Sequence, residues 1–165
     1  REVPEVMTAL GAEVNQRIQA DVRDGQRVIV MIYGLQRYRQ LRRSEDAFGL
    51  SMDTEATPQA DAQFADVLRD GPAVGLHTIL WADTLATIER TLDRQTAREF
   101  DYRVLFQMSA ADSSNLIDST AANQLGFHRV LLYSEEQGGI EKFRPYAPLT
   151  DEWLALIKQQ LVSKL

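Results

Sequence analysis

Few residues in this sequence could form a catalytic site on their own. There is no cysteine, which excludes thiolate nucleophiles, disulfides and cysteine-based zinc sites. The two histidines, His77 and His128, lie far apart with no further histidine or cysteine near them, so we expect no metal site. Asp112 and Ser113 are adjacent, but no histidine lies at the spacing of a known catalytic motif, and helix capping explains the pair better.

The densest basic segment contains four arginines, and it has two explanations. A run of this kind is typical of a contact with DNA or a nucleotide. It is also typical of a solvated helix face, which we favour because Glu45 and Asp46 follow directly. The whole chain has a net charge of −6, so any DNA contact must use a local basic strip. The four candidates are Arg37, Arg39, Arg42 and Arg43.

Alternating helices and strands are expected to position these residues. Val28 to Ile32 is a continuous apolar run, which is typical of a strand buried on both faces of a parallel sheet. We expect further strands at 76–82, 102–108, 129–133 and 140–144, the last two as a hairpin. We expect helices at 3–24, 35–43, 58–71, 85–92, 109–117, 121–125 and 150–164, with a polar loop at 44–57 and an N-cap at Thr57-Pro58.

This pattern predicts one α/β domain over residues 1–165, with its core between residues 27 and 145. We expect three layers, α/β/α, around a mostly parallel sheet that ends in an antiparallel hairpin. The final helix is expected to bury Trp153, Leu154, Ile157 and Leu161, and Trp81 and His77 are expected in the core.

Several of these segments match short motifs of one known protein family, in the same order. The strand Gly75 to Leu80 is similar to a Gly-Ile-His strand of that family, and Tyr102 to Phe106 to its Thr-Arg-Ile-Ala-Phe strand. Ser109 to Asp118 resembles Ser-x-x-Asp-Ser-Arg-x-Ile-Leu-Asp, and the segments Gln124-Leu125-Gly126 and Leu131-Leu132-Tyr133 resemble the closing motifs. The order and approximate spacing hold from Val28 to Tyr133, so the chain resembles the motor domain of FtsK/SpoIIIE-type P-loop ATPases.

The resemblance implies a RecA-like fold that assembles into a ring and pumps double-stranded DNA or protein with ATP and Mg²⁺. The family's Walker A loop has no counterpart in this sequence, so we expect the distal half of a domain, cut from a longer protein. The Walker B aspartate and glutamate are also missing, because Ile32 is followed by Tyr33 and Gly34. A phenol with a pKa near 10 cannot replace a carboxylate at neutral pH. We therefore expect no cofactor in this chain and no hydrolysis by it alone.

The resemblance also gives roles to three further residues. Asp83 matches a polar sensor of the γ-phosphate, although an N-cap shared with Thr84 explains it without a ligand. Arg103 matches a family arginine just inside its strand, and Arg98 lies in the loop before it, so either is a candidate to reach into a neighbour's site. An ion pair within the chain, with Glu99 or Asp101, is the simpler explanation. Where the family often has a second arginine, this chain has Ser114, which weakens the site.

The remaining expectations concern location and partners. The absence of cysteine and of a signal-peptide pattern favours the cytoplasm, and no apolar run favours membrane contact. We expect the missing half of the domain, further copies in a ring and double-stranded DNA as partners. A different class of function also fits the replacement of the Walker B acids by Tyr33 and Gly34. The chain would then be a non-catalytic scaffold for protein–protein interaction that keeps the motor fold.

Overall fold

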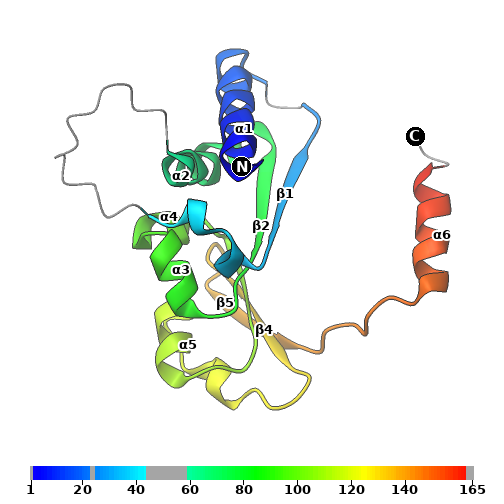
Figure 1. The fold of residues 1–165 in the computed structure, drawn as a ribbon. Coiled ribbons are helices and arrows are strands. Elements are labelled where there is room, and N and C mark those ends of the chain that lie inside the picture. Colours follow the sequence, from blue (N-terminus) through cyan, green and yellow to red (C-terminus); the bar gives the residue numbers. More distant parts are fainter. Residues whose placement is uncertain (1, 23–24, 44–58, 163–165) are drawn as a thin grey trace. The chain divides into compact units, whose positions relative to one another are not determined.

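The computed structural model describes residues 2–22, 25–43 and 59–162, which form a mixed α/β structure (Figure 1). The chain divides into two compact units, Arg1–Asp101 and Tyr102–Leu165. The predicted loop at 44–57 and the predicted cap at Thr57-Pro58 lie outside the described residues. Within these described ranges, no helix is both long and apolar enough to cross a membrane.

The first unit is built on a pair of parallel strands. β1 (Val28–Tyr33) pairs with β2 (Leu76–Trp81) in a register that sets Val28 opposite Leu76 and Tyr33 opposite Trp81. Because the strands are parallel, their carboxyl ends meet at one edge. The other elements of this unit are α1 (Glu2–Gln19), η1 (Leu35–Arg37), η2 (Arg39–Leu41), α2 (Ala60–Asp70), η4 (Pro72–Val74), α3 (Leu85–Thr91) and α4 (Arg94–Arg98).

One face of the strand pair is covered by helices of the same unit. Met7 of α1 and Phe64 of α2 pack with Ile32 of β1 in the main cluster of buried side chains. A second cluster joins Val14 of α1 to Leu76 of β2. Figure 1 shows α1 and α2 beside the upper part of the strands. The helical spacing of the apolar residues in both helices produces this packing.

The opposite face of the strand pair is exposed, which corrects the prediction of strands buried on both faces. Burial alternates along both strands, so every second side chain points away from the core. The large exposed side chains on this face are Ile29, Met31, Tyr33, Ile79 and Trp81, with exposed fractions between 42% and 74%. His77 is exposed as well, so the expectation that Trp81 and His77 lie in the core is wrong.

The second unit contains an antiparallel sheet in the order β3-β4-β5. β3 (Tyr102–Leu105) pairs with β4 (Val130–Ser134), which pairs with β5 (Gly139–Phe143), so the predicted hairpin is confirmed. α5 (Ala110–Ile117) and η5 (Ala121–Gln124) form a small core with the sheet, and the Ser109 side chain caps α5 by accepting from Asp112 N. α6 (Asp151–Val162) completes the unit.

Three further predictions differ from the structure. α6 has no buried residue, so Trp153, Leu154, Ile157 and Leu161 are not core residues as expected. α1 ends at Gln19 rather than at residue 24, because Asp21 adopts a left-handed backbone conformation (φ 48°) that ends a helix. Parallel pairing is limited to β1 and β2 among the described strands, whereas a mostly parallel sheet was expected.

Candidate functional site

The carboxyl edge of the β1–β2 pair is where an α/β fold would place a ligand. β1 ends with Tyr33, whose ring stacks on that of Trp81 with centroids 4.9 Å apart and an angle of 23° between the planes. Gly34 N donates to the carbonyl of Trp81 at 3.2 Å and fixes the two strand ends together. Aromatic rings thus occupy the strand ends where a metal-dependent phosphoryl-transfer site needs carboxylates.

Gly34 turns the chain sharply after β1. Its backbone is left-handed, with φ 79° and ψ 64°, a conformation that a glycine adopts without strain. A β-carbon at this position would lie 3.4 Å from Cδ and Nε of Arg37, so the Arg37 side chain passes over the glycine. Across residues 2–22, 25–43 and 59–162, no group of three or more His, Asp or Glu side chains is arranged to hold a metal ion.

Asp83 follows β2 and belongs to a small network of hydroxyl groups. Its Oδ1 accepts from Thr87 Oγ1 at 2.7 Å and from Thr84 Oγ1 at 3.3 Å. The hydrogen bond from Thr87 lowers the pKa of Asp83. Thr84 is the N-cap of α3 and accepts from Thr87 N, so the predicted cap is confirmed, with Thr84 providing it. The Asp83 side chain is exposed, and its role as a nucleotide sensor stays a prediction.

The two candidate trans arginines lie in different surroundings. Arg98 is the exposed last residue of α4 in the first unit. Arg103, on β3 of the second unit, donates from Nη1 to the carbonyl of Leu116 at 2.8 Å and lies 5.4 Å from the ring centre of Tyr133. Its Nη2 is 2.9 Å from Glu135 Oε2, close enough for an ion pair although the two atoms are not aligned as a hydrogen bond.

The environment of Arg103 corrects the expected ion pair with Glu99 or Asp101, because the partner is Glu135 on the turn after β4. Antiparallel pairing places Arg103 opposite Tyr133, which brings the β4–β5 turn next to it. Only 15% of the Arg103 side chain is exposed. A guanidinium with an acid, a carbonyl and an aromatic ring around it stabilises the second unit, and this arrangement argues against a role in a neighbouring molecule.

Two short 3-10 turns, η1 and η2, replace the predicted helix 35–43; they carry Arg37 and Arg39, while Arg42 and Arg43 follow the second turn. All four side chains are exposed. Arg43 N donates to the carbonyl of Arg90 at 3.1 Å, so α3 lies beside the end of this run. Asp93 is also close, since the charge of Arg43 contributes, after the hydrogen bond from the Thr96 backbone, to lowering the pKa of Asp93.

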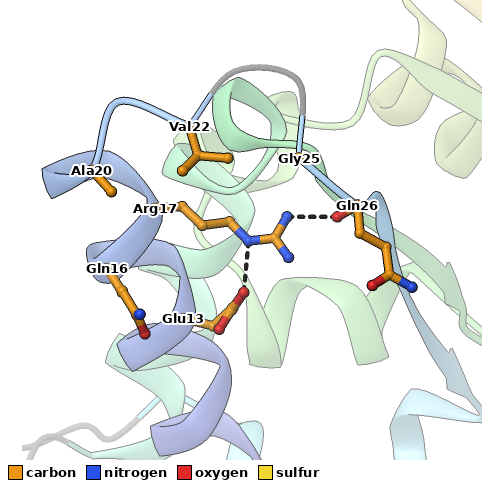
Figure 2. Close-up of a pocket in the computed structure, with 7 residues that line it drawn as sticks. All are labelled: Glu13, Gln16, Arg17, Ala20, Val22, Gly25 and Gln26. Carbon is orange, nitrogen blue, oxygen red and sulfur yellow. Dashed lines mark hydrogen bonds and ion pairs between the residues drawn. The ribbon is translucent and has the colours of Figure 1, made fainter.

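A shallow pocket of about 260 Å³ lies at the end of α1 and was not found from the sequence (Figure 2). Arg17 lies at its centre, with Nε 2.7 Å from Glu13 Oε1 and Nη1 donating to the carbonyls of Gln26 at 2.7 Å and Val74 at 3.2 Å. The spacing of Glu13 and Arg17, four residues apart on a helix, was the available signal. The Arg17 guanidinium already has these partners within the chain. Its hydrogen bonds connect α1 to the segments that precede β1 and β2.

The site residues therefore fall into separate groups rather than one active centre. The first unit holds the Tyr33–Trp81 stack, Asp83 and the arginine run, while Arg103 belongs to a network of its own in the second unit. No protein-family model and no curated protein matches this chain, so the FtsK/SpoIIIE relationship remains a prediction from the quoted motifs.

Proposed function

We propose that this chain is the distal half of an FtsK/SpoIIIE-type ATPase domain and that it does not hydrolyse ATP by itself. The proposal depends on one observation, the absence of a carboxylate at the end of β1, where the chain has Tyr33 and Gly34. Tyr33 and Gly34 stand where Mg²⁺ and the attacking water would need acidic groups. The sequence also contains no Gly-Lys-Ser/Thr loop for the phosphates.

The exposed face of the strand pair supports the half-domain proposal. A two-stranded sheet is marginal alone, and parallel sheets normally have both faces covered. Here Met31 is 74% exposed and Ile79 is 55% exposed, on the face opposite to α1 and α2. Apolar side chains in this arrangement fit a missing layer of protein, which the other half of the domain would supply.

The intact domain would carry the family's role, ATP-driven translocation of double-stranded DNA by a homo-oligomeric ring in the cytoplasm. In that assembly ATP and Mg²⁺ would bind mainly through the Walker A half. Asp83 would lie near the γ-phosphate, at the edge where the two strands end. Arg98 is the better candidate for contact with a neighbouring subunit, because its side chain is exposed and that of Arg103 is engaged within its own unit.

Phosphate release by the purified chain tests this proposal. We expect no turnover above background with Mg-ATP, and turnover that co-purifies with the folded protein would overturn the proposal. The chain extended by its natural upstream sequence should gain Mg-ATP binding in calorimetry. Calorimetry of Mg-ATP binding to the extended protein, with and without the change Tyr33→Ala, shows whether the aromatic stack affects nucleotide binding.

The second candidate is a non-catalytic scaffold, favoured by the Tyr33–Trp81 stack in place of acidic residues. Two stacked rings stabilise the strand ends but provide no chemistry for phosphoryl transfer. A scaffold of this kind would keep the fold and dock a protein partner. Tight Mg-ATP binding by the extended protein would exclude a pure scaffold, whereas undetectable binding would exclude the nucleotide-binding half-domain.

A further inference from the structure

The last helix of the second unit has an apolar stripe that no other described element buries. All 12 residues of α6 are at least partly exposed, and Trp153 and Leu161 are 55% and 59% exposed. Their spacing places them on one side of the helix together with Leu154, Leu156 and Ile157, and these five residues are named here the α6 stripe. An isolated helix of this length is marginal in water, so a covering surface for the stripe would stabilise α6.

The sheet of the same unit has an exposed apolar strip along its edge strand. Tyr102 and Val104 of β3, and Phe106 directly after it, are 59%, 54% and 56% exposed. Alternation puts these three side chains on one face of the sheet, and they are named here the β3 strip. Leu105 points to the opposite face, where it packs in the core with Ile117 of α5. Among the described elements of the second unit, α5 and η5 therefore cover one face of the sheet and leave the β3 strip open.

The stripe and the strip match in length, and together they offer enough area for a protein interface. From Trp153 to Leu161 the helix rises about 12 Å, and from Tyr102 to Phe106 the strand extends about 13 Å. A fully buried aromatic side chain covers about 150–250 Å², so three half-exposed rings and their aliphatic neighbours would bury roughly 600 Å² in one such contact. Two contacts of this kind bury about 1,200 Å², the lower limit for a specific interface, whereas one contact falls short.

The borders of the two surfaces carry opposite charges. Strand pairing sets Val104 opposite Leu132 and Leu132 opposite Glu141, so Glu141 lies on the face of the β3 strip. Lys158 follows Leu154 by one turn and borders the α6 stripe. Both charged side chains are exposed, and neither forms an ion pair within the described residues. A helix laid along the β3 strip would bring these two charges together and lower the energy of both.

The connection between β5 and α6 favours a second copy of the chain as the partner of the stripe. Arg144 to Thr150 has neither helix nor strand, and at about 3.1 Å per residue it spans roughly 20 Å. Pro145 and Pro148 fix their own φ and hold the residues before them extended. No glycine lies between Gly139 and α6 to provide a sharp turn. The connection therefore directs α6 away from its own sheet.

We propose that two copies of this chain exchange α6, so that the α6 stripe of each copy packs on the β3 strip of the other. The dimer is symmetric, because each copy gives one helix and receives one. Lys158 of one copy then pairs with Glu141 of the other. The inference goes beyond the proposed ATPase role, because the exchange needs no nucleotide, no DNA and no residue at the end of β1.

Crosslinking between two single-cysteine variants of the full chain tests the exchange, because the chain has no cysteine of its own. Val104→Cys lies in the middle of the β3 strip, and Ile157→Cys lies in the middle of the α6 stripe. A mixture of these variants treated with a short bis-maleimide should give a product that contains one chain of each, identified by mass spectrometry. The matched control replaces Ile157→Cys by Gln159→Cys, which points away from the stripe and should give about tenfold less product.

Sedimentation equilibrium measures the dissociation constant of the dimer. Trp153→Ala removes the largest side chain of the α6 stripe twice per dimer, so Kd should rise at least about 100-fold. Glu141→Lys and Lys158→Glu each bring like charges together and should raise Kd about tenfold, while the double variant should recover most of this loss. Lys142→Gln removes a charge from the opposite face of β5 and is the control, with Kd within about twofold of wild type.

Three results would overturn the inference. The first is wild-type protein that stays monomeric up to about 0.1 mM. The second is equal crosslinking of the Ile157→Cys and Gln159→Cys mixtures. The third is a variant with both Val104→Cys and Ile157→Cys that crosslinks only within one chain, which would place α6 on its own sheet. If Trp153→Ala or Val104→Cys fails to fold, the charge reversals at two exposed side chains decide the question, and a double variant without recovery of Kd contradicts the proposed packing.

Discussion

The two faces of the β1–β2 pair have similar side chains and opposite surroundings. On one face Ile32 and Leu76 are buried under α1 and α2, with exposed fractions of 7% and 0%. On the other face Met31 and Ile79 are exposed, at 74% and 55%. Both faces are rich in β-branched or large apolar residues, so composition does not distinguish them.

This difference indicates which part of the core the chain completes by itself. A strand that reads as apolar on every residue needs two covering layers, and the helices of the first unit provide one. One face is therefore exposed because no described element of the first unit packs on it, and not because its side chains are more polar. The following predictions test this division, beginning with the largest effect.

Phe64→Ala should be the most damaging change, because Phe64 is 1% exposed and anchors α2 on the covered face. Loss of the ring should lower the free energy of unfolding by about 3–5 kcal/mol, measured by urea denaturation. Met31→Ala on the bare face is the matched control and should cost at most about 0.5 kcal/mol. An equal cost at Met31 would mean that this face is covered in solution.

Arg17→Gln should have an intermediate effect, because it loosens the attachment of the covering helix α1. The variant loses two hydrogen bonds to the carbonyls of Gln26 and Val74, and we expect unfolding to become easier by roughly 1–2 kcal/mol. Glu13→Gln removes only the half-exposed acid of the ion pair and should cost about 0.5 kcal/mol or less. Thermal unfolding of the two variants in parallel compares them, and equal losses would contradict the role given to the backbone contacts.

Ile29→Ser combined with Ile79→Ser should leave the free energy of unfolding nearly unchanged and reduce self-association. Both side chains are more than half exposed, so a polar replacement loses little burial. Exposed apolar patches favour association, so light scattering over a concentration series should show a smaller weight-average mass for the variant than for wild type. Unaltered association would place the contact elsewhere on the chain.

Asp83→Asn should produce the smallest effect, visible only as a change with pH. The hydrogen bond from Thr87 lowers the pKa of Asp83 in the folded protein. The ionised carboxylate therefore stabilises the fold above its unfolded pKa of about 3.9, and this contribution is lost as pH falls through the lower folded value. The difference in melting temperature between wild type and Asp83→Asn should shrink as the pH falls from 5 to 3. A constant difference would show that the ionised Asp83 carboxylate does not stabilise the fold.

Local signals in the sequence predicted most of the elements. The caps at Thr84 and Ser109 are confirmed because a hydroxyl next to a helix start has few other uses. The β4–β5 hairpin is confirmed because the segment Glu135 to Gly139 is typical of a turn between two apolar runs. Signals of this kind depend only on neighbouring residues, which the sequence contains directly.

Tertiary packing could not be predicted in the same way. Trp153 and Leu154 have helical spacing in α6, yet spacing does not reveal whether a partner for that helix exists. Arg103 was expected to pair with an acid nearby in sequence, but strand pairing brings Glu135 to it. Arg90 gave no signal, because only the fold places it beside the basic run. These three cases depend on contacts between distant segments.

The left-handed turn at Gly34 limits how an acidic pair could be introduced at the end of β1. An aspartate can replace Tyr33 on a regular strand, but a glutamate at position 34 would have to adopt φ near 79°, which costs a side-chain-bearing residue about 1 kcal/mol or more. Its β-carbon would only touch the Arg37 side chain, at 3.4 Å, so the backbone conformation is the main obstacle. Two point mutations that introduce carboxylates at positions 33 and 34 are therefore not enough, because the backbone after β1 must change as well. An engineered hydrolase built on this chain needs a redesigned loop at this position.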